Sequence, residues 1–166
     1  MFDILLSRHD SCFSGPVCKE PIDLAFILDE SGSIINRNWG IMKKFTETLI
    51  RSFDISDQGT HVAAVMFSND AEVLIRFNDF TGPNNNVESV ARKVRSFPRS
   101  GIGGRTYINK ALDLTNTDIF TKENGMRGPD VQKVRNIFCF FKRAALCCVC
   151  ILRLALSFQV FLCYPC

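Results

Sequence analysis

Asp29, Ser31 and Ser33 place three oxygen-bearing side chains at alternate positions directly after an apolar run, residues 22–28. A short apolar run of this kind predicts a buried strand, so the three side chains should lie on a loop at its carboxyl end. Mg²⁺ prefers oxygen ligands and keeps part of its water shell, so one carboxylate and two hydroxyls could form half of a divalent-metal site. A serine at this place could instead cap the helix that follows. The sequence leaves both interpretations open, and a metal site needs further ligands from elsewhere in the chain.

The segments after this loop alternate between helix and strand patterns. Apolar residues recur every three or four positions over 36–53, which predicts an amphipathic helix. Apolar runs over 61–67 and 72–77 flank the turn residues 68–70. This arrangement predicts two strands joined as an antiparallel hairpin.

Two shorter helix patterns follow the hairpin. They cover 87–97 and 108–114, and the glycine-rich stretch 101–106 connects them. The order of strand, helix, hairpin and further helices predicts an α/β fold with a doubly wound, mostly parallel sheet and one antiparallel hairpin strand. Ligands of such sheets bind outside the carboxyl ends of the strands. The hydroxyl of Thr106, at the end of the glycine-rich stretch, could therefore lie beside Asp29.

The positive charge of the chain comes from its final segment. The formal net charge is +3, but 135–166 hold four basic residues and no acidic ones, which leaves 16 basic and 17 acidic residues in 1–134. No basic stripe with interleaved aromatic residues runs through 1–134, so nucleic-acid binding is not expected. Residues 1–17 lack the basic and apolar regions of a secretory signal peptide and are interpreted as a lead-in.

Cysteines are concentrated in the same final segment. Six of the eight lie in 135–166, and the other two are Cys12 and Cys18. Their spacing gives neither a paired zinc-ligand pattern nor an even disulfide framework. The sequence therefore predicts no metal site for the cysteines.

Residues 18–134 resemble the N-terminal part of a von Willebrand factor type A domain, of the kind found in matrilins, collagens and related extracellular adhesion proteins. Three stretches carry the resemblance: PIDLAFILDESGSI at 21–34, VAAVMFSNDAEVLIRF at 62–77 and GGRTYINKAL at 103–112. Their order and spacing fit the family.

This resemblance implies a metal-ion-dependent adhesion site. In such a site Ser31, Ser33 and Thr106 would bind Mg²⁺ or Mn²⁺ directly, and Asp29 would act largely through water. A Glu or Asp side chain of a protein partner, such as collagen or another matrix protein, would complete the shell of the metal. The implied function is adhesion in the extracellular matrix or at a cell surface, without enzymatic activity. Cys18 resembles the family's cysteine that pairs with one beyond the last helix.

Two other functions fit the sequence less well. A hydrolase or phosphotransferase could use Asp29 as its nucleophile, but the chain has no G-x-S-x-G elbow, no second Asp two residues later and no phosphate-binding lysine motif. An intracellular type A domain that organises a complex through the same metal has only the missing signal peptide in its favour.

The resemblance stops near residue 134. Family members continue with an apolar strand that ends in Thr-Asp-Gly and supplies a second carboxylate, and this tripeptide is absent here. A site without that carboxylate is expected to bind its metal weakly. The fold is expected to be incomplete because later strands are missing. The first strand, 22–28, would then have an open edge, which the final segment could cover as a helix or a strand. The chain is expected to be unstable as a soluble monomer.

Residues 135–166 have two interpretations. Residues 144–163 are apolar enough and long enough for a transmembrane helix, although Arg153 near its middle would cost about 2.5–3.5 kcal/mol. Alternatively, the segment is the read-through of an exon boundary at Lys133. Its cysteine-rich composition has no clean period, and the codons of Lys133 and the two following residues can match the start of many introns.

Overall fold

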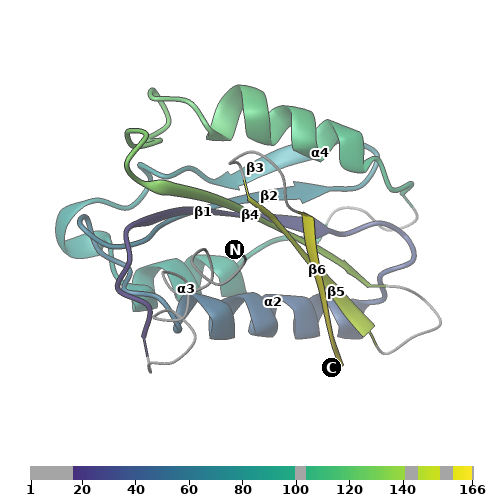
Figure 1. Ribbon diagram of the computed structural model, residues 1–166. Coiled ribbons are helices and arrows are strands. Elements are labelled where there is room, and N and C mark those ends of the chain that lie inside the picture. The colour runs from purple at the N-terminus through teal and green to yellow at the C-terminus, as the bar shows by residue number, and fades with distance from the viewer. Residues whose placement is uncertain (1–16, 100–103, 141–145, 154–158, 166) are drawn as a thin grey trace, which may run out of the picture.

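A six-stranded sheet with helices on both of its faces forms the centre of the molecule (Figure 1). The computed structural model describes residues 17–99, 104–140, 146–153 and 159–165. The strands lie in the order β3-β2-β1-β4-β5-β6. Their bounds are Ile22–Asp29 (β1), His61–Phe67 (β2), Ala71–Ile75 (β3), Gln132–Phe140 (β4), Leu146–Arg153 (β5) and Gln159–Pro165 (β6).

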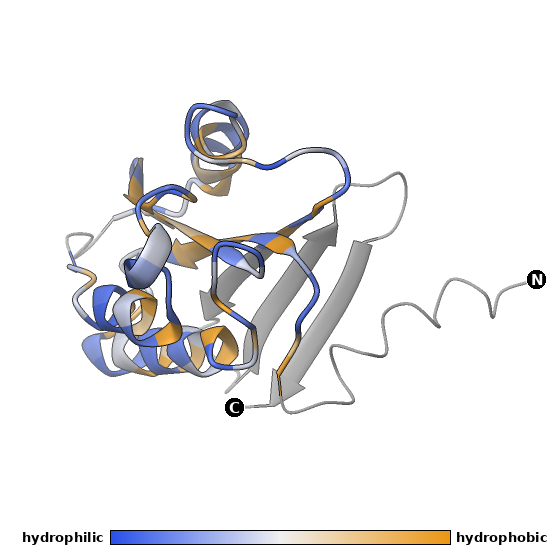
Figure 2. Ribbon diagram, turned by 90° about the vertical axis from the view of Figure 1, so that its left-hand side faces the viewer, coloured by the Kyte–Doolittle hydropathy of each residue, from blue (hydrophilic) through white to orange (hydrophobic). Residues whose placement is uncertain are grey.

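The helices cover the sheet from both sides. Figure 2 shows α4 on one side of the sheet and α2 with α3 on the other, and each of them carries both hydrophilic and hydrophobic residues. Their bounds are Asn36–Ile50 (α2), Val87–Arg95 (α3) and Ile108–Leu114 (α4), which continues as a π-helical turn over Thr115–Ile119, and a short 3-10 turn spans Gly82–Asn84. The doubly wound α/β fold predicted from the sequence is confirmed.

All eight residues of β1 are buried because both of its faces are covered. Leu24, Phe26 and Leu28 belong to the apolar cluster shared with α2 and α3. Ala25 and Ile27 belong to the second cluster, shared with α4. The continuous apolar run in the sequence is therefore the signature of a central strand.

The helices lie where the sequence predicted them, but their last residues differ from the predicted ones. The side of α2 that packs on the sheet carries four buried residues at helical spacing: Trp39, Met42, Thr46 and Ile50. The helix ends at Ile50 and not at the predicted residue 53. The second helix, predicted over 87–97, ends at Arg95. Its start is fixed by a cap, because the side chain of Asn86 accepts the N–H of Ser89 at 3.0 Å.

The predicted hairpin is present. β2 and β3 are antiparallel, with Phe67 opposite Ala71. On its other side β2 runs parallel to β1. The carboxyl ends of β1 and β2 therefore lie at the same edge of the sheet, which is where the candidate site is found.

The edge of β1 is not open, because the final segment covers it as a strand, one of the two outcomes expected for this edge. Residues 132–140 form β4, which runs parallel to β1 with Leu24 opposite Val134 and Leu28 opposite Phe138. β5 and β6 continue the sheet as antiparallel strands. Part of the final segment thus takes the place beside β1 that a family strand would occupy.

The interpretation of 144–163 as a transmembrane helix is wrong for the residues that the structure describes. Of these, 146–153 lie in β5 and 159–163 lie in β6. No helix within the described ranges is long and apolar enough to cross a membrane. The predicted lead-in, 1–17, lies outside the described residues except for its last residue.

Candidate metal centre

The loop after β1 holds the three predicted ligands close together. Asp29 is buried, and its carboxylate accepts the backbone N–H of Ser31 at 2.8 Å. The Oγ atoms of Ser31 and Ser33 are 3.2 Å apart. Ser31 is buried and Ser33 is exposed. The three oxygen-bearing side chains therefore lead from the end of the buried strand out to the surface.

The alternative role of these serines as helix caps is not supported. The residue that caps α2 is Ile35, and no side chain makes a capping hydrogen bond there. Ser31 and Ser33 lie upstream of this position and hydrogen-bond to each other. Their hydroxyls are therefore not used to start the helix.

The electrostatics of Asp29 favour a nearby cation. Burial raises the pKa of the Asp29 carboxyl, because water is removed from its charged form, while its hydrogen bonds with Ser31 lower the pKa and the charge of Glu30 raises it. The ionised carboxylate is thus held in an unfavourable environment. A bound divalent cation would offset that cost.

A second loop, residues 104–107, is fastened against the first. The backbone N–H of Gly32 donates to the carbonyl oxygen of Gly104 at 2.9 Å. The N–H of Tyr107 donates to the carbonyl of Ser68 at 3.1 Å, and the N–H of Arg105 donates to Oδ1 of Asn69 at 2.9 Å.

These contacts join three loops at one edge of the sheet: the loop after β1, the turn after β2 and the loop before α4. Thr106 lies exposed on the last of them. The loop that carries Thr106 is therefore held against the loop of Asp29, Ser31 and Ser33. Among the described residues, the Thr106 hydroxyl makes no hydrogen bond with these three predicted ligands.

Ser68 is a part of this junction that the sequence analysis interpreted only as a turn residue. It is 5% exposed, and its Oγ has no hydrogen-bond partner among the described residues. A Cβ atom added to Gly104 would lie only 1.9 Å from this Oγ. Gly104 therefore allows the two loops to approach each other closely. The sequence alone could not show that the turn Ser-Asn-Asp meets the loop that contains Gly-Gly.

Replacing Gly104 with alanine is expected to lower the free energy of unfolding by about 1–3 kcal/mol, because the new Cβ overlaps Ser68 and the loop must shift away from the motif. Gly40→Ala is the matched control. Gly40 lies in α2, and a Cβ added there would meet nothing within 4 Å, so alanine should stabilise the helix by up to about 1 kcal/mol. Urea unfolding of both variants measures the difference. Equal effects of the two substitutions would contradict the proposed close approach.

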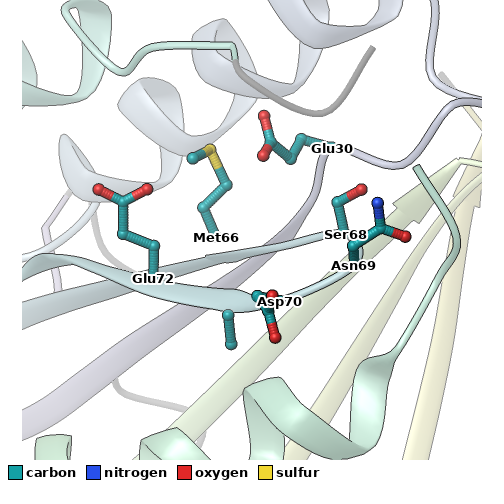
Figure 3. A pocket seen from close by; sticks show the side chains of 7 residues that line it. Glu30, Met66, Ser68, Asn69, Asp70 and Glu72 are labelled. Atoms are coloured by element: carbon teal, nitrogen blue, oxygen red, sulfur yellow. The ribbon is translucent and has the colours of Figure 1, made fainter. Parts of the chain in front are cut away.

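A cavity of about 200 Å³ adjoins the motif on the β2–β3 side. Figure 3 shows the side chains of Glu30, Met66 and Glu72 on one side of the strands and that of Asp70 on the other. The residues that line the cavity are Glu30, Met66, Ser68, Asn69, Asp70, Ala71 and Glu72. Three carboxylates thus line the cavity, but Asp70 pairs with Nζ of Lys110, so the negative potential that would favour a cation there is partly offset.

The third side of the site carries no carboxylate. By the register of β1 and β4, Leu28 lies opposite Phe138, so β4 also ends at this edge. The sequence of β4, QKVRNIFCF, contains no acidic residue, and none follows it. Within the described ranges no group of three or more His, Cys, Asp or Glu side chains could hold a metal. The donor set is therefore one carboxylate with hydroxyls, which fits a weakly held hard cation that keeps several waters.

Comparison with known proteins places the chain in a family. The family model described as von Willebrand factor type A domain matches residues 23–139. Cochlin of Bos taurus is 30% identical over 115 residues, which are 69% of this chain and 20% of cochlin. The collagen alpha-6(VI) chain of Homo sapiens is 32% identical over 133 residues, which are 76% of this chain and 6% of the collagen chain. The chain thus spans a fifth or less of these relatives.

Solved structures show the same fold. Proximal thread matrix protein 1 from the mussel byssus superposes with a TM-score of 0.66 at 25% identity, over 74% of this chain and 31% of that one. A further structure of the mussel protein, with a zinc-occupied MIDAS motif, has the same TM-score at 24% identity, over 74% of this chain and 32% of that one. With more than half of its residues matched by the family model, the chain belongs to the von Willebrand factor type A domain family.

Proposed function

We propose that this chain is a divalent-metal-dependent adhesion module of an extracellular matrix or cell-surface protein, and not an enzyme. The metal, Mg²⁺ or Mn²⁺, would be held by Ser31, Ser33 and Thr106, with Asp29 acting largely through water. One observation supports this proposal above the others. The hydrogen bond from Gly32 to Gly104 fastens the loop of Thr106 against the loop that carries the other three side chains.

The chemistry of such a site is the capture of a carboxylate. A metal held by hydroxyls and water among few protein charges keeps most of its positive charge. A Glu or Asp side chain of a partner would replace one water and form an ionic bond to the metal. β4 contributes no acidic residue, so the site has less negative charge than one with two carboxylates. It should therefore bind its metal more weakly than such a site.

The extracellular setting has two supports. The relatives named above include cochlin and a collagen VI chain, and von Willebrand factor of Rattus norvegicus is 31% identical over 114 residues. Cys18 is disulfide-bonded, and disulfides persist mainly in oxidising compartments. A matrix protein that presents an acidic side chain, such as a collagen, is the partner that this setting suggests.

Substitution of Ser33 by alanine should weaken the binding of Mg²⁺ and Mn²⁺ by at least about tenfold. Even outer-shell partners of bound metals cost about 10–100-fold in affinity when they are removed, and Ser33 is proposed as a direct ligand. Titration calorimetry of the wild type and the variant measures the effect. Ser52→Ala is the control, because Ser52 is also exposed but follows α2, away from the motif.

Two results would count against the proposed site. Equal heats from the wild type and Ser33→Ala would remove Ser33 from the ligand set. Equal losses in Ser33→Ala and Ser52→Ala would mean that the calorimeter reports general instability of the variants and not the loss of a ligand.

A further inference from the structure

The loop after the π-helical turn contains the one Asn-Gly pair of the sequence, Asn124-Gly125. Gly125 has a φ angle of +89°, in the left-handed region that side chains other than hydrogen rarely allow. A Cβ atom added there would lie 2.8 Å from the backbone nitrogen of Asn78. The conformation of the loop therefore requires glycine directly after Asn124.

Asparagine is chemically labile, and a following glycine makes it more so because no side chain hinders the glycine nitrogen. The nitrogen of Gly125 can attack Cγ of Asn124. A new C–N bond forms, the bond from Cγ to Nδ2 breaks, and the NH₂ group leaves as ammonia with the proton that the glycine nitrogen loses. Water then opens the resulting succinimide ring at either carbonyl and gives aspartate or isoaspartate. The reaction needs no reactant other than water.

Both reacting groups are held by hydrogen bonds in the folded loop. The N–H of Gly125 donates to the carbonyl oxygen of Lys122 at 3.2 Å. Nδ2 of Asn124 donates to the carbonyl oxygen of Asp118 at 2.9 Å and also to Oδ1 of the same residue. The attack needs a free glycine nitrogen and a side chain turned towards it. These hydrogen bonds must therefore break before the reaction can start.

The loop is also fastened to the segment that follows β3. Nδ2 of Asn78 donates to the carbonyl oxygen of Glu123 at 2.9 Å. The carboxylate of Asp118 pairs with Arg76, with 2.8 Å between Oδ2 and the guanidinium nitrogen. Opening of the loop thus costs contacts on two sides, which makes the open state a minor population.

Deamidation would change what the loop can form when it closes. The product carries a carboxylate in place of Nδ2, and a carboxylate oxygen accepts hydrogen bonds but donates none. It would face the carbonyl oxygen and the carboxylate of Asp118, so that two negative charges would meet. The hydrogen bonds that closed the loop around Asn124 could then no longer form.

We propose that Asn124 is a deamidation site gated by the loop 121–126. The closed loop protects the amide, local opening exposes it to attack, and the new carboxylate then opposes closure. The inference does not depend on the proposed metal site. β3 starts at the edge of that site, where Ala71 lies opposite Phe67, and runs away from it, so the loop contacts the far end of β3.

The test incubates the full-length chain at mildly alkaline pH, folded in buffer and unfolded in concentrated urea. Cleavage with trypsin after Lys122 and Arg127 isolates Asn124 in peptide 123–127, and cleavage after Lys110 isolates Asn116 in peptide 111–122. Mass spectrometry measures the conversion of asparagine, and chromatography separates aspartate from isoaspartate. A sample taken at time zero corrects for deamidation during the digest.

Asn116 is the internal control, because it is exposed and is followed by Thr117, whose branched side chain hinders the attack. In urea Asn124 should react faster than Asn116. Asn124 should also react at least about tenfold faster in urea than in the folded chain, because the loop opens only rarely.

A variant of Asn78 tests the gate. Asn78→Ala keeps the Cβ that lies beside Gly125 and removes the amide that holds Glu123. It should raise the rate at Asn124 in the folded chain and leave the rate in urea unchanged. Asn109→Ala, at an exposed position of α4, is the matched control and should change neither rate.

A variant of Asn124 tests the effect on closure. Asn124→Asp reproduces one product and should lower the midpoint of urea unfolding, whereas Asn116→Asp, at an exposed position, should not.

Four results would overturn the proposal. Equal rates for Asn124 and Asn116 in urea would remove the site. Equal rates for Asn124 in the folded and the unfolded chain would remove the gate, as would a rate in folded Asn78→Ala no higher than that in Asn109→Ala. An unchanged midpoint in Asn124→Asp would contradict the effect on closure. The comparison of folded and unfolded wild type needs no variant, so the test stays decisive if Asn78→Ala does not fold.

Discussion

Replacement of Asp23 by asparagine is expected to lower the free energy of unfolding by about 3–5 kcal/mol, because it leaves two cations without their buried partner. The Asp23 side chain has no exposed surface. Its Oδ1 accepts from Nε of Arg127 at 2.7 Å, and its Oδ2 accepts the backbone N–H of the same arginine at 2.9 Å. Nζ of Lys133 lies 3.4 Å from Oδ2. Asparagine keeps the shape but removes the charge and replaces one accepting oxygen by an NH₂ group that cannot accept, so the loss reports the ion pairs together with one hydrogen bond to Arg127.

The same arginine ties together three segments of the chain. Its guanidinium also donates to the carbonyl oxygens of Gly59 and Ile22, each at 2.8 Å. The side chains of Arg127 and Lys133 are only 19% and 14% exposed, so neither is well solvated when the carboxylate is neutralised. This cluster fastens the segment before β4 to the amino end of β1, the end opposite to the candidate metal site.

Glu88→Gln is the matched control for Asp23→Asn. Glu88 pairs with Arg51, and its side chain is 60% exposed. Exposed ion pairs contribute about 0–1 kcal/mol, so this isosteric change should have little effect. Urea unfolding of both variants is the measurement. A loss in Asp23→Asn that is no larger than the loss in Glu88→Gln would contradict the assigned role of the buried cluster.

Most of the fold up to residue 119 could be predicted from local patterns. The central strand was evident because two-sided burial of β1 requires an unbroken apolar run. The hairpin was evident because turn residues separate two apolar runs by a short distance. The ends of the helices were less certain, since the sequence continues the apolar spacing of α2 to Phe53, whereas the helix ends at Ile50.

The final strands could not be predicted because no local sequence pattern distinguishes them from helices. The sequence of β5, LCCVCILR, is apolar on both faces, and a continuous apolar stretch does not separate a strand from a helix by its period. The choice depends on pairing with β4 and β6, which is a contact between segments. The same limit applies to the site: the motif around Asp29 was visible in the sequence, but the contact of Ser68 with Gly104 was not.

Arg135 shows that the final segment fits its place imperfectly. It lies in β4 opposite Ala25, on the face of the sheet that α4 covers. It is 8% exposed, and its Nε has no hydrogen-bond partner within the described ranges. Burial lowers the pKa of its guanidinium to about 10, so the group remains charged at neutral pH. A favourable contact is made with the ring of Phe120, whose centroid lies 4.5 Å from the guanidinium carbon.

Substitution of Arg135 by leucine is therefore expected to raise the free energy of unfolding by about 1–4 kcal/mol. Apolar replacements of buried charges are neutral or stabilising on this scale, and Arg135 forms no ion pair with the described residues that would be lost in return. Arg92→Leu, at an exposed position of α3, is the control and should change stability by no more than about 0.5 kcal/mol. Thermal and urea unfolding measure both. A loss of stability in Arg135→Leu would mean that the contact with Phe120 outweighs the cost of burying the charge. A gain would show that the chain from residue 135 carries a residue poorly matched to a core strand, as the departure from the family near this point predicts.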